Sequence, residues 1–188
     1  MLEKEYEWKE FDCKEFHDKK EKDPTLDVPN LPYYADGDLK ITHSIAIIRY
    51  LGRKHGLVAK NDKDTIEQDM MDGMTFNLIV NWGWMGYGEQ DKLSFDMEFQ
   101  KIMLQELEDH LKNRQYCVGT YLTYSDFCIF ERLDAIQIRF PGIFDSYPNL
   151  KQFHESIETD DVMCLSGTDY RLQSRCVEAR NRIAGAVG

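Results

Sequence analysis

The fold is decided by residues 29–44, which read PNLPYYADGDLKITHS and lead directly into an apolar helix pattern over residues 45–54. Pro32 has no N–H, and it pushes Leu31 before it towards an extended conformation. We therefore expect a free backbone edge at Leu31 that can pair with a ligand.

The second half of this stretch predicts a chain reversal and a helix start. Asp36-Gly37 is a typical hairpin turn pair, and Ser44 stands where a helix N-cap belongs. Orphan N–H groups and the positive end of the helix dipole at Ser44 favour a carboxylate ligand. These residues alone fit two interpretations: a cradle for a small anionic peptide, or an ordinary strand-turn-strand-helix unit without a ligand.

Composition limits the classes of partner. The 188 residues are 42% hydrophobic and carry 34 acidic against 23 basic side chains, for a net charge of −11. This charge repels nucleic acid and anionic membranes, and no apolar run is long enough to span a bilayer. Five cysteines without a CxxC pair indicate neither a disulfide framework nor a zinc site, so we expect a reducing cytosol and no metal.

Beyond the polar stretch 61–64, which predicts a domain boundary, the sequence shows only helical spacing. Two long amphipathic helices are predicted, and their methionines are interpreted as core filler. The apolar positions of the two helices are Ile66, Met70, Met74, Leu78 and Ile79, then Met97, Ile102, Leu104, Leu107 and Leu111. A capping-box pattern at residues 123–126 predicts a third helix that runs to Ile138 and stops at residues 140–142; a fourth opens at residues 147–153.

The ordered run VPNLPYYADGDLKITHS followed by AIIRYL resembles the glutathione-binding segment of cytosolic glutathione transferases, closest to the mu class, and the match continues in weaker form to Glu158. The resemblance implies an α+β/α fold, with an incomplete thioredoxin-like domain in residues 1–57 and an all-helical domain in residues 64–188. It also implies a cytoplasmic, homodimeric detoxification enzyme that uses glutathione as co-substrate, without a cofactor, on small hydrophobic electrophiles.

The resemblance also assigns glutathione contacts, one position at a time. Asn30 and Leu31 match the side-chain and backbone contacts, Pro32 matches a cis proline, and Ser44 matches the hydroxyl that receives the γ-glutamyl carboxylate. His43 replaces the usual glutamine but can still donate a hydrogen bond.

Other assigned positions depart from the family or are placed loosely. Asn77 replaces an acidic residue lent by the partner subunit, and Val28 replaces an aromatic key that inserts into that subunit. We expect the valine to weaken the dimer. Lys22, or alternatively Lys19 or Lys20, would supply the cation that binds the glycyl carboxylate. Any single one of these lysines can also be interpreted as part of a solvated run of charged residues. Tyr87 matches a tyrosine that lines the electrophile pocket, although an aromatic plug is the other interpretation.

The reaction implied by the resemblance needs a group that ionises the glutathione thiol. The mu class uses a tyrosine in a G-Y-W-like motif on its first strand, and this sequence contains no such motif. No catalytic residue is therefore assigned, and we expect weak or no conjugation by this chain. The alternative functions are a non-catalytic glutathione-binding or crystallin-like structural protein, and a helical interaction module without a glutathione role.

Overall fold

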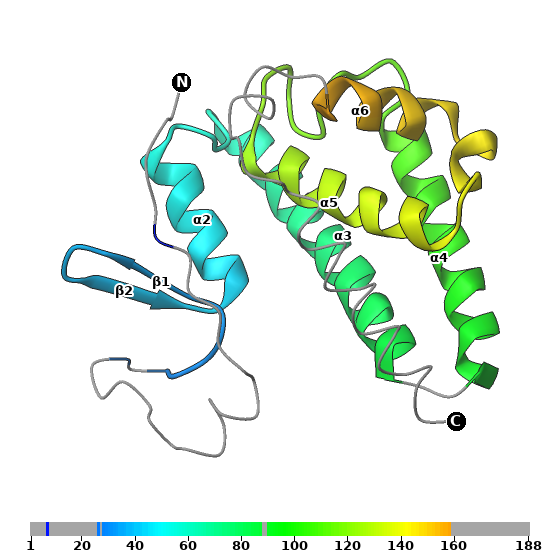
Figure 1. The fold of residues 1–188 in the computed structure, drawn as a ribbon. Coiled ribbons are helices and arrows are strands. Elements are labelled where there is room, and N and C mark those ends of the chain that lie inside the picture. Colours follow the sequence, from blue (N-terminus) through cyan, green and yellow to red (C-terminus); the bar gives the residue numbers. More distant parts are fainter. Residues whose placement is uncertain (1–6, 8–25, 27, 88–89, 159–188) are drawn as a thin grey trace. The chain divides into compact units, whose positions relative to one another are not determined.

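The computed structural model describes residues 7, 26, 28–87 and 90–158 (Figure 1). The chain divides into two compact units, one of residues 3–58 and one of residues 59–188 together with residues 1–2. The last thirty residues of the sequence, and also the predicted site lysines Lys19, Lys20 and Lys22, lie outside the described residues.

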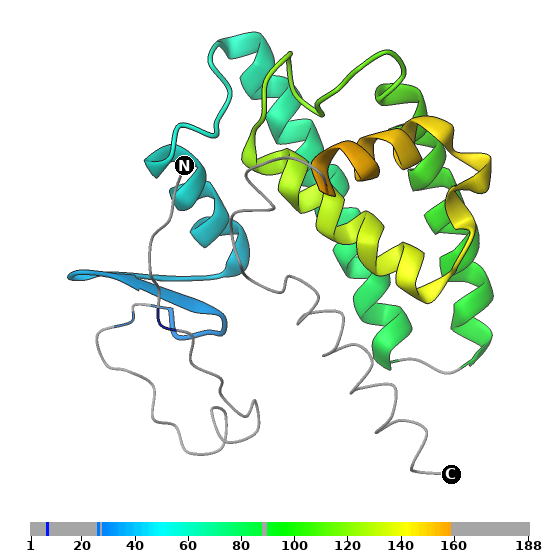
Figure 2. The ribbon, with the colours of Figure 1, turned by 45° about the horizontal axis from the view of Figure 1, so that its top comes forward.

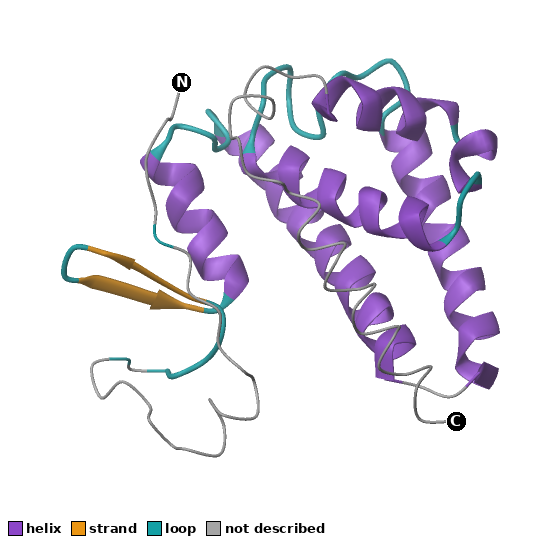
Figure 3. Cartoon of the chain, viewed as in Figure 1, coloured by secondary structure: helices purple, strands orange, loops and turns teal. Residues whose placement is uncertain are grey.

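The first unit contains a two-stranded antiparallel hairpin. Strand β1 is Tyr33–Asp36 and strand β2 is Leu39–Thr42, with Tyr33 opposite Thr42 and Asp36 opposite Leu39 (Figure 3). The hairpin prediction is confirmed, although Asp36 belongs to the strand and the two loop residues are Gly37 and Asp38. Gly37 has φ 62°, and a positive φ at the first loop residue fits a type II′ turn.

Helix α2, Ser44–Lys54, follows the hairpin and packs against both strands. Gly56 ends it as the sequence predicts, with a left-handed φ of 70°. The Leu57 N–H donates to the Gly52 carbonyl at 2.8 Å and the Gly56 N–H donates to the Arg53 carbonyl at 3.3 Å, which is the Schellman pattern. Helix α2 therefore has a defined end before the second unit begins.

The second unit is all-helical in its described part. It contains α3 Asp62–Tyr87, α4 Gln90–His110, α5 Tyr124–Arg139, the short 3₁₀ helix η1 Ile143–Ser146 and α6 Pro148–Glu158 (Figure 2). Helix α3 packs against α4 and α5, while α6 packs against α4, α5 and η1. The core is built from fully buried aliphatic side chains: Leu78, Leu104, Leu107, Leu111, Ile129, Leu133, Leu150 and Ile157.

The predicted capping box starts α5. The Asp126 carboxylate accepts the Thr123 N–H at 2.7 Å, and its other oxygen accepts the Cys117 N–H from the preceding loop at 2.7 Å. Burial raises the pKa of Asp126, while these N–H donors act in the opposite direction. One carboxylate thus fixes both the helix start and the loop before it.

The start of α6 is held by a residue that the sequence analysis did not single out. The buried Glu108 carboxylate of α4 accepts the Asn149 N–H at 3.0 Å, the Asn149 side-chain amide at 2.6 Å and the Leu150 N–H at 2.9 Å. Because the first N–H groups of a helix have no partner inside it, Glu108 serves as a cap from another helix.

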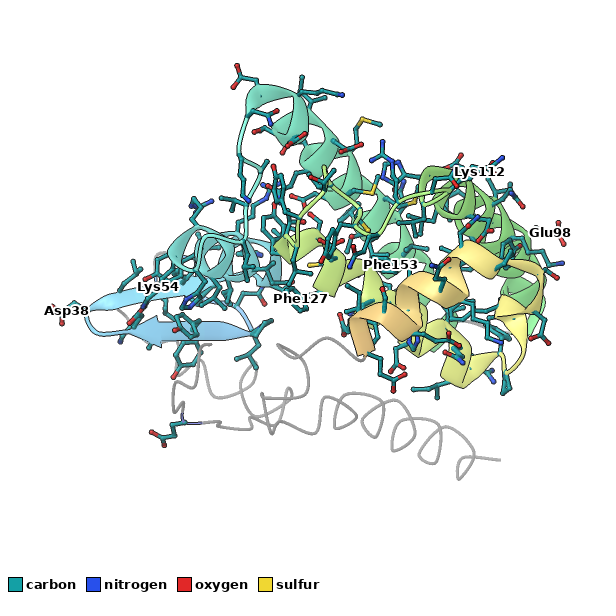
Figure 4. All side chains as sticks on the ribbon, turned by 90° about the horizontal axis from the view of Figure 1, so that it is seen from above. Asp38, Lys54, Glu98, Lys112, Phe127 and Phe153 are labelled. Atoms are coloured by element: carbon teal, nitrogen blue, oxygen red, sulfur yellow. The ribbon has the colours of Figure 1, made fainter. Side chains whose placement is uncertain are left out.

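The sequence predicts the wrong side of α3 as its buried side. Ile66 and Met70 are 63% and 61% exposed, and only Leu78 of the predicted apolar row is fully buried. The inward face carries Gln68 and Asp72 instead, because hydrogen-bonding groups meet them there: the Ser125 and Tyr124 hydroxyls of α5, and the Ala59 N–H just before α3. Ile102 of α4 and Ile138 of α5 are also exposed, against the prediction, and Phe153 of α6 is buried (Figure 4).

Candidate functional site

The predicted ligand-binding residues meet at the open end of the hairpin. Residues 30–32 come directly before β1, and residues 43–44 come directly after β2. Because Tyr33 pairs with Thr42, the two segments leave the hairpin side by side. Figure 4 labels Asp38 at the opposite, turn end. Five positions that are up to fourteen residues apart in sequence therefore form one candidate site.

The segment before β1 has a defined backbone. The Leu31–Pro32 peptide is cis, as the resemblance implies. The Asn30 side-chain oxygen accepts the Leu31 N–H at 2.9 Å. The expectation of a free edge at Leu31 is therefore wrong for its N–H, because a short polar side chain next to it already supplies the acceptor. A ligand carbonyl must displace Asn30 to pair with this N–H.

A second contact ties the two segments together. The Thr42 hydroxyl at the end of β2 donates to the Val28 carbonyl at 2.7 Å, across fourteen residues of sequence. The sequence analysis missed this bond, and only the hairpin register could have indicated it. The Val28 side chain itself is 58% exposed.

The helix start differs from the prediction by one residue. Ser44 is the first residue of α2, and His43 is the N-cap, so the assignment of Ser44 as N-cap is wrong. His43 has φ 67° and ψ 118°, a backbone conformation that is uncommon for a residue with a side chain, and its side chain makes no cap hydrogen bond. At His43 the chain turns from β2 into α2. The side chains of His43 and Ser44 are both exposed.

The electrostatics at this helix start favour an anion. Helix α2 has no acidic residue in its first turn, and Arg53 and Lys54 occupy its last turn. The orphan N–H groups and the positive dipole end at Ser44 are thus not neutralised from within the helix.

The far end of the hairpin is fastened to α2 by a polar cluster. The Tyr50 hydroxyl donates to the Asp36 carboxylate at 2.8 Å, and Lys54 forms an ion pair with the same carboxylate. The hydrogen bond to Asp36 raises the pKa of Tyr50 and also that of Lys54. The cluster fixes the hairpin against the helix, so the open end keeps its geometry.

The remaining predicted site residues are not brought to this place by any described contact. Asn77 is exposed on α3 in the helical unit. Lys19, Lys20 and Lys22 lie outside the described residues, and of Tyr87 only the backbone, at the end of α3, is described.

The helical unit holds two thiols in its described part. Cys117 and Cys128 are both free and buried. Burial raises the pKa of Cys128 to about 12 and raises that of Cys117 as well, so neither is a nucleophile at neutral pH. These two cysteines therefore act as small hydrophobic residues of the helical unit.

The described residues form neither a metal site nor a membrane-spanning helix. Residues 28–87 and 90–158 contain no group of three or more histidine, cysteine or acidic side chains arranged to hold a metal ion. In the same part of the chain, no helix is both long and apolar enough to cross a membrane.

Comparison with known proteins gives consistent matches. A family model described as "Glutathione S-transferase, C-terminal domain" matches residues 79–162. The class-mu 26 kDa isozyme 7 of Fasciola hepatica is 35% identical over 135 residues, covering 71% of this chain and 62% of the relative. Glutathione S-transferase Mu 1 of Oryctolagus cuniculus is 35% identical over 136 residues, with the same coverage. The solved structure of the glutathione S-transferase Blo t 8 matches with a TM-score of 0.70 at 28% identity, covering 77% of this chain and 71% of that chain.

The hairpin and helix followed by this helical unit have the fold of a glutathione S-transferase, with part of a thioredoxin-like domain and an all-helical C-terminal domain. In sequence, the chain is similar to the mu-class glutathione S-transferases. It spans 62% of the length of these two relatives.

Proposed function

We propose that this chain binds glutathione at the open end of the hairpin. The observation that carries the proposal is the register of β1 and β2, which sets the cis Leu31–Pro32 edge beside the start of α2. An extended peptide pairs with a backbone edge, and a carboxylate binds at a helix N-terminus. Glutathione offers both groups in one small molecule.

Each site residue has a proposed role. Leu31 binds the backbone of the cysteinyl residue, and Asn30 rotates from the Leu31 N–H to contact the tripeptide. Ser44 and the first N–H groups of α2 bind the γ-glutamyl carboxylate, with His43 as an additional donor. Lys22 neutralises the glycyl carboxylate.

Two further roles fall to residues of the helical unit. Asn77 replaces a charged partner of the glutamyl amine. We expect this to cost affinity, because a charge-assisted hydrogen bond contributes roughly 1.5–3 kcal/mol against about 1 kcal/mol for a neutral one. Tyr87 lines the pocket for a hydrophobic electrophile.

The proposed chemistry is attack of the glutathione thiolate on such an electrophile, in detoxification in the cytoplasm. A free thiol is ionised to only a few per cent at neutral pH. No residue of this sequence matches the family motif that stabilises the thiolate, so we expect turnover by the chain to be weak.

The second candidate is a non-catalytic glutathione-binding or structural role. The absence of a thiolate-stabilising motif favours this second candidate. The departures from the family's residues at His43, Asn77 and Val28 favour it as well. In either case we expect a homodimer that is weak, because Val28 buries less area than an aromatic key.

The test combines binding and turnover. The purified chain is passed over immobilised glutathione and, in parallel, assayed for conjugation of glutathione to a chromogenic aryl halide. We expect retention, with turnover far below that of a full-length mu-class enzyme. Ser44→Ala should reduce retention, while Ser146→Ala, an exposed serine of the helical unit, should leave it unchanged. Absence of retention would exclude glutathione binding, and turnover equal to that of the full-length enzyme would exclude the impaired catalysis.

A further inference from the structure

The connection between α2 and α3 is a short loop that is tied down at both ends (Figure 3). On the side of the first unit, the Leu57 N–H donates to the Gly52 carbonyl at 2.8 Å. On the side of the helical unit, the Ala59 N–H donates to the Gln68 side-chain oxygen at 3.1 Å. The two units divide between these ties, directly after Val58, which forms no hydrogen bond with the described part of the chain. The untied part of the connection is therefore a single residue.

A tyrosine from a distant loop holds the next residue of this connection. The Tyr121 hydroxyl accepts the Lys60 N–H at 2.8 Å, across sixty-one residues of sequence. The Lys60 ammonium lies over the same ring, 3.8 Å from its centroid, where a cation is attracted to the aromatic face. Tyr121 thus binds both the backbone and the side chain of Lys60.

Tyr121 is itself fixed to the start of α3. Its hydroxyl donates to the Asp64 carboxylate at 2.5 Å, and the Asn61 side-chain amide donates to the same oxygen at 2.8 Å. Gly119, two residues before Tyr121, has φ 56°, and its N–H donates to the Glu67 carboxylate at 2.9 Å. A Cβ added at Gly119 would lie 3.0 Å from both the Asp64 carboxylate and the Tyr121 ring. The loop therefore needs a glycine here to approach α3 so closely.

We propose that Tyr121 is a positioning residue that clamps the connection between the two units to the helical unit. One hydroxyl accepts from Lys60 and donates to Asp64, so it joins the connection to the first turn of α3. The place at which the chain enters the helical unit is then set by the loop between α4 and α5 as well as by α3. Without this hydroxyl, the Lys60 N–H loses its acceptor, and the bond from Ala59 to Gln68 is the tie that remains before α3 begins.

The test is limited trypsin digestion of the full chain, followed by mass spectrometry. Trypsin cleaves after Lys60 when the connection opens locally, and opening requires the lysine to leave the Tyr121 ring. Cleavage after Lys112 is an internal reference, because Lys112 and Lys60 are both exposed, lie outside helices and are followed by an asparagine. We expect Tyr121→Phe to raise cleavage after Lys60 about fivefold, as for the loss of one hydrogen bond, and to leave cleavage after Lys112 unchanged.

The matched control is Tyr116→Phe, the same change at another tyrosine of this loop. The Tyr116 hydroxyl accepts a bond from the neighbouring Gln115 side chain, so its loss should leave both cleavage rates unchanged. Hydrogen exchange gives a second readout. The Lys60 amide should exchange faster in Tyr121→Phe, while the Leu57 amide, whose acceptor is Gly52, should keep its rate.

A second variant disturbs the clamp but keeps the hydroxyl. Gly119→Ala puts a methyl group against Asp64 and Tyr121 and should also raise cleavage after Lys60. Gly142→Ala strains another glycine of positive φ, 84°, and should leave that rate unchanged. Equal cleavage after Lys60 in Tyr121→Phe and the unchanged chain would overturn the proposal. A rise after Lys60 and Lys112 together would overturn it as well, because general loosening of the helical unit would then be the cause.

Discussion

Replacing Glu108 by alanine should destabilise the helical unit strongly, because one carboxylate caps α6. It accepts three hydrogen bonds, from the Asn149 N–H, the Asn149 side-chain amide and the Leu150 N–H. Leu150 is fully buried, so its N–H loses its partner without gaining water. An orphaned buried donor costs about 1–3 kcal/mol, and the lost charge at the helix N-terminus adds roughly 0.3–1 kcal/mol.

With the two remaining bonds replaced by water, we expect the free energy of unfolding to fall by about 1.5–4 kcal/mol. That is a large part of the ~5–15 kcal/mol that holds a typical domain together. The assay is urea unfolding of the full chain, followed by far-UV circular dichroism. The matched control is Glu106→Ala, the same change at an exposed position two residues away on α4.

A second variant separates capping from simple loss of volume. Glu108→Gln keeps the shape and one acceptor but presents an NH₂ group to donors, so it should lose about half as much stability as Glu108→Ala. If Glu108→Ala unfolds within about 0.5 kcal/mol of Glu106→Ala, the range expected for neutral surface changes, the capping role is refuted.

Three other expectations concern polar and thiol groups of the helical unit. Tyr124→Phe removes the 2.8 Å bond from its hydroxyl to buried Asp72 and should cost about 1–3 kcal/mol in urea unfolding; an unchanged midpoint would contradict this. Burial acts to raise the pKa of Glu67, but hydrogen bonds from Gly119 and Arg114 outweigh it, so the pKa is lowered in the folded state. The ionised Glu67 therefore stabilises the fold fully above the unfolded-state pKa of about 4.3. This contribution is lost as the pH falls through the lower pKa of the folded state. In thermal melts at a series of pH values, the melting temperature of Glu67→Gln should fall less towards acid pH than that of the unchanged chain. If the two curves of melting temperature against pH run parallel, the expectation is refuted. In a variant whose other three cysteines are serine, the thiols of Cys117 and Cys128 should react with Ellman's reagent only after unfolding, and fast labelling at pH 8 would contradict their burial.

The hairpin, the Gly56 helix end and the start of α5 were predictable because their signals are local. A glycine with positive φ or a capping carboxylate acts within a few residues of itself, so the sequence alone contains both partners. The start of α6 at Pro148 was predictable for the same reason, but its cap was not, since Glu108 lies forty residues earlier.

One error is local, and the others depend on partners far along the chain. The Leu31 N–H was expected to be free, yet Asn30 takes it. The inward face of α3 includes the polar side chains Gln68 and Asp72 because α5 supplies hydrogen-bonding groups to them, and Ile66 and Met70 lie on the outward face. Hydrophobic spacing identified the helix but could not determine which side faces its neighbours.

The same distinction applies to the candidate site. Residues 30–32 and 43–44 were predicted as site residues, and the register of β1 and β2 brings them together. The Thr42 hydroxyl bond to the Val28 carbonyl, which joins the two segments, was not predictable because it depends on that register.

The central claim is that glutathione binds at the open end of the hairpin, and amide NMR during a glutathione titration tests it most directly. We predict chemical-shift changes at the amides of Leu31, His43 and Ser44, with none at Gly37 in the turn at the opposite end. Ser44→Ala should shift the titration to higher glutathione concentration. No change at Leu31 and Ser44 at millimolar glutathione, or changes centred on the turn, would contradict the account.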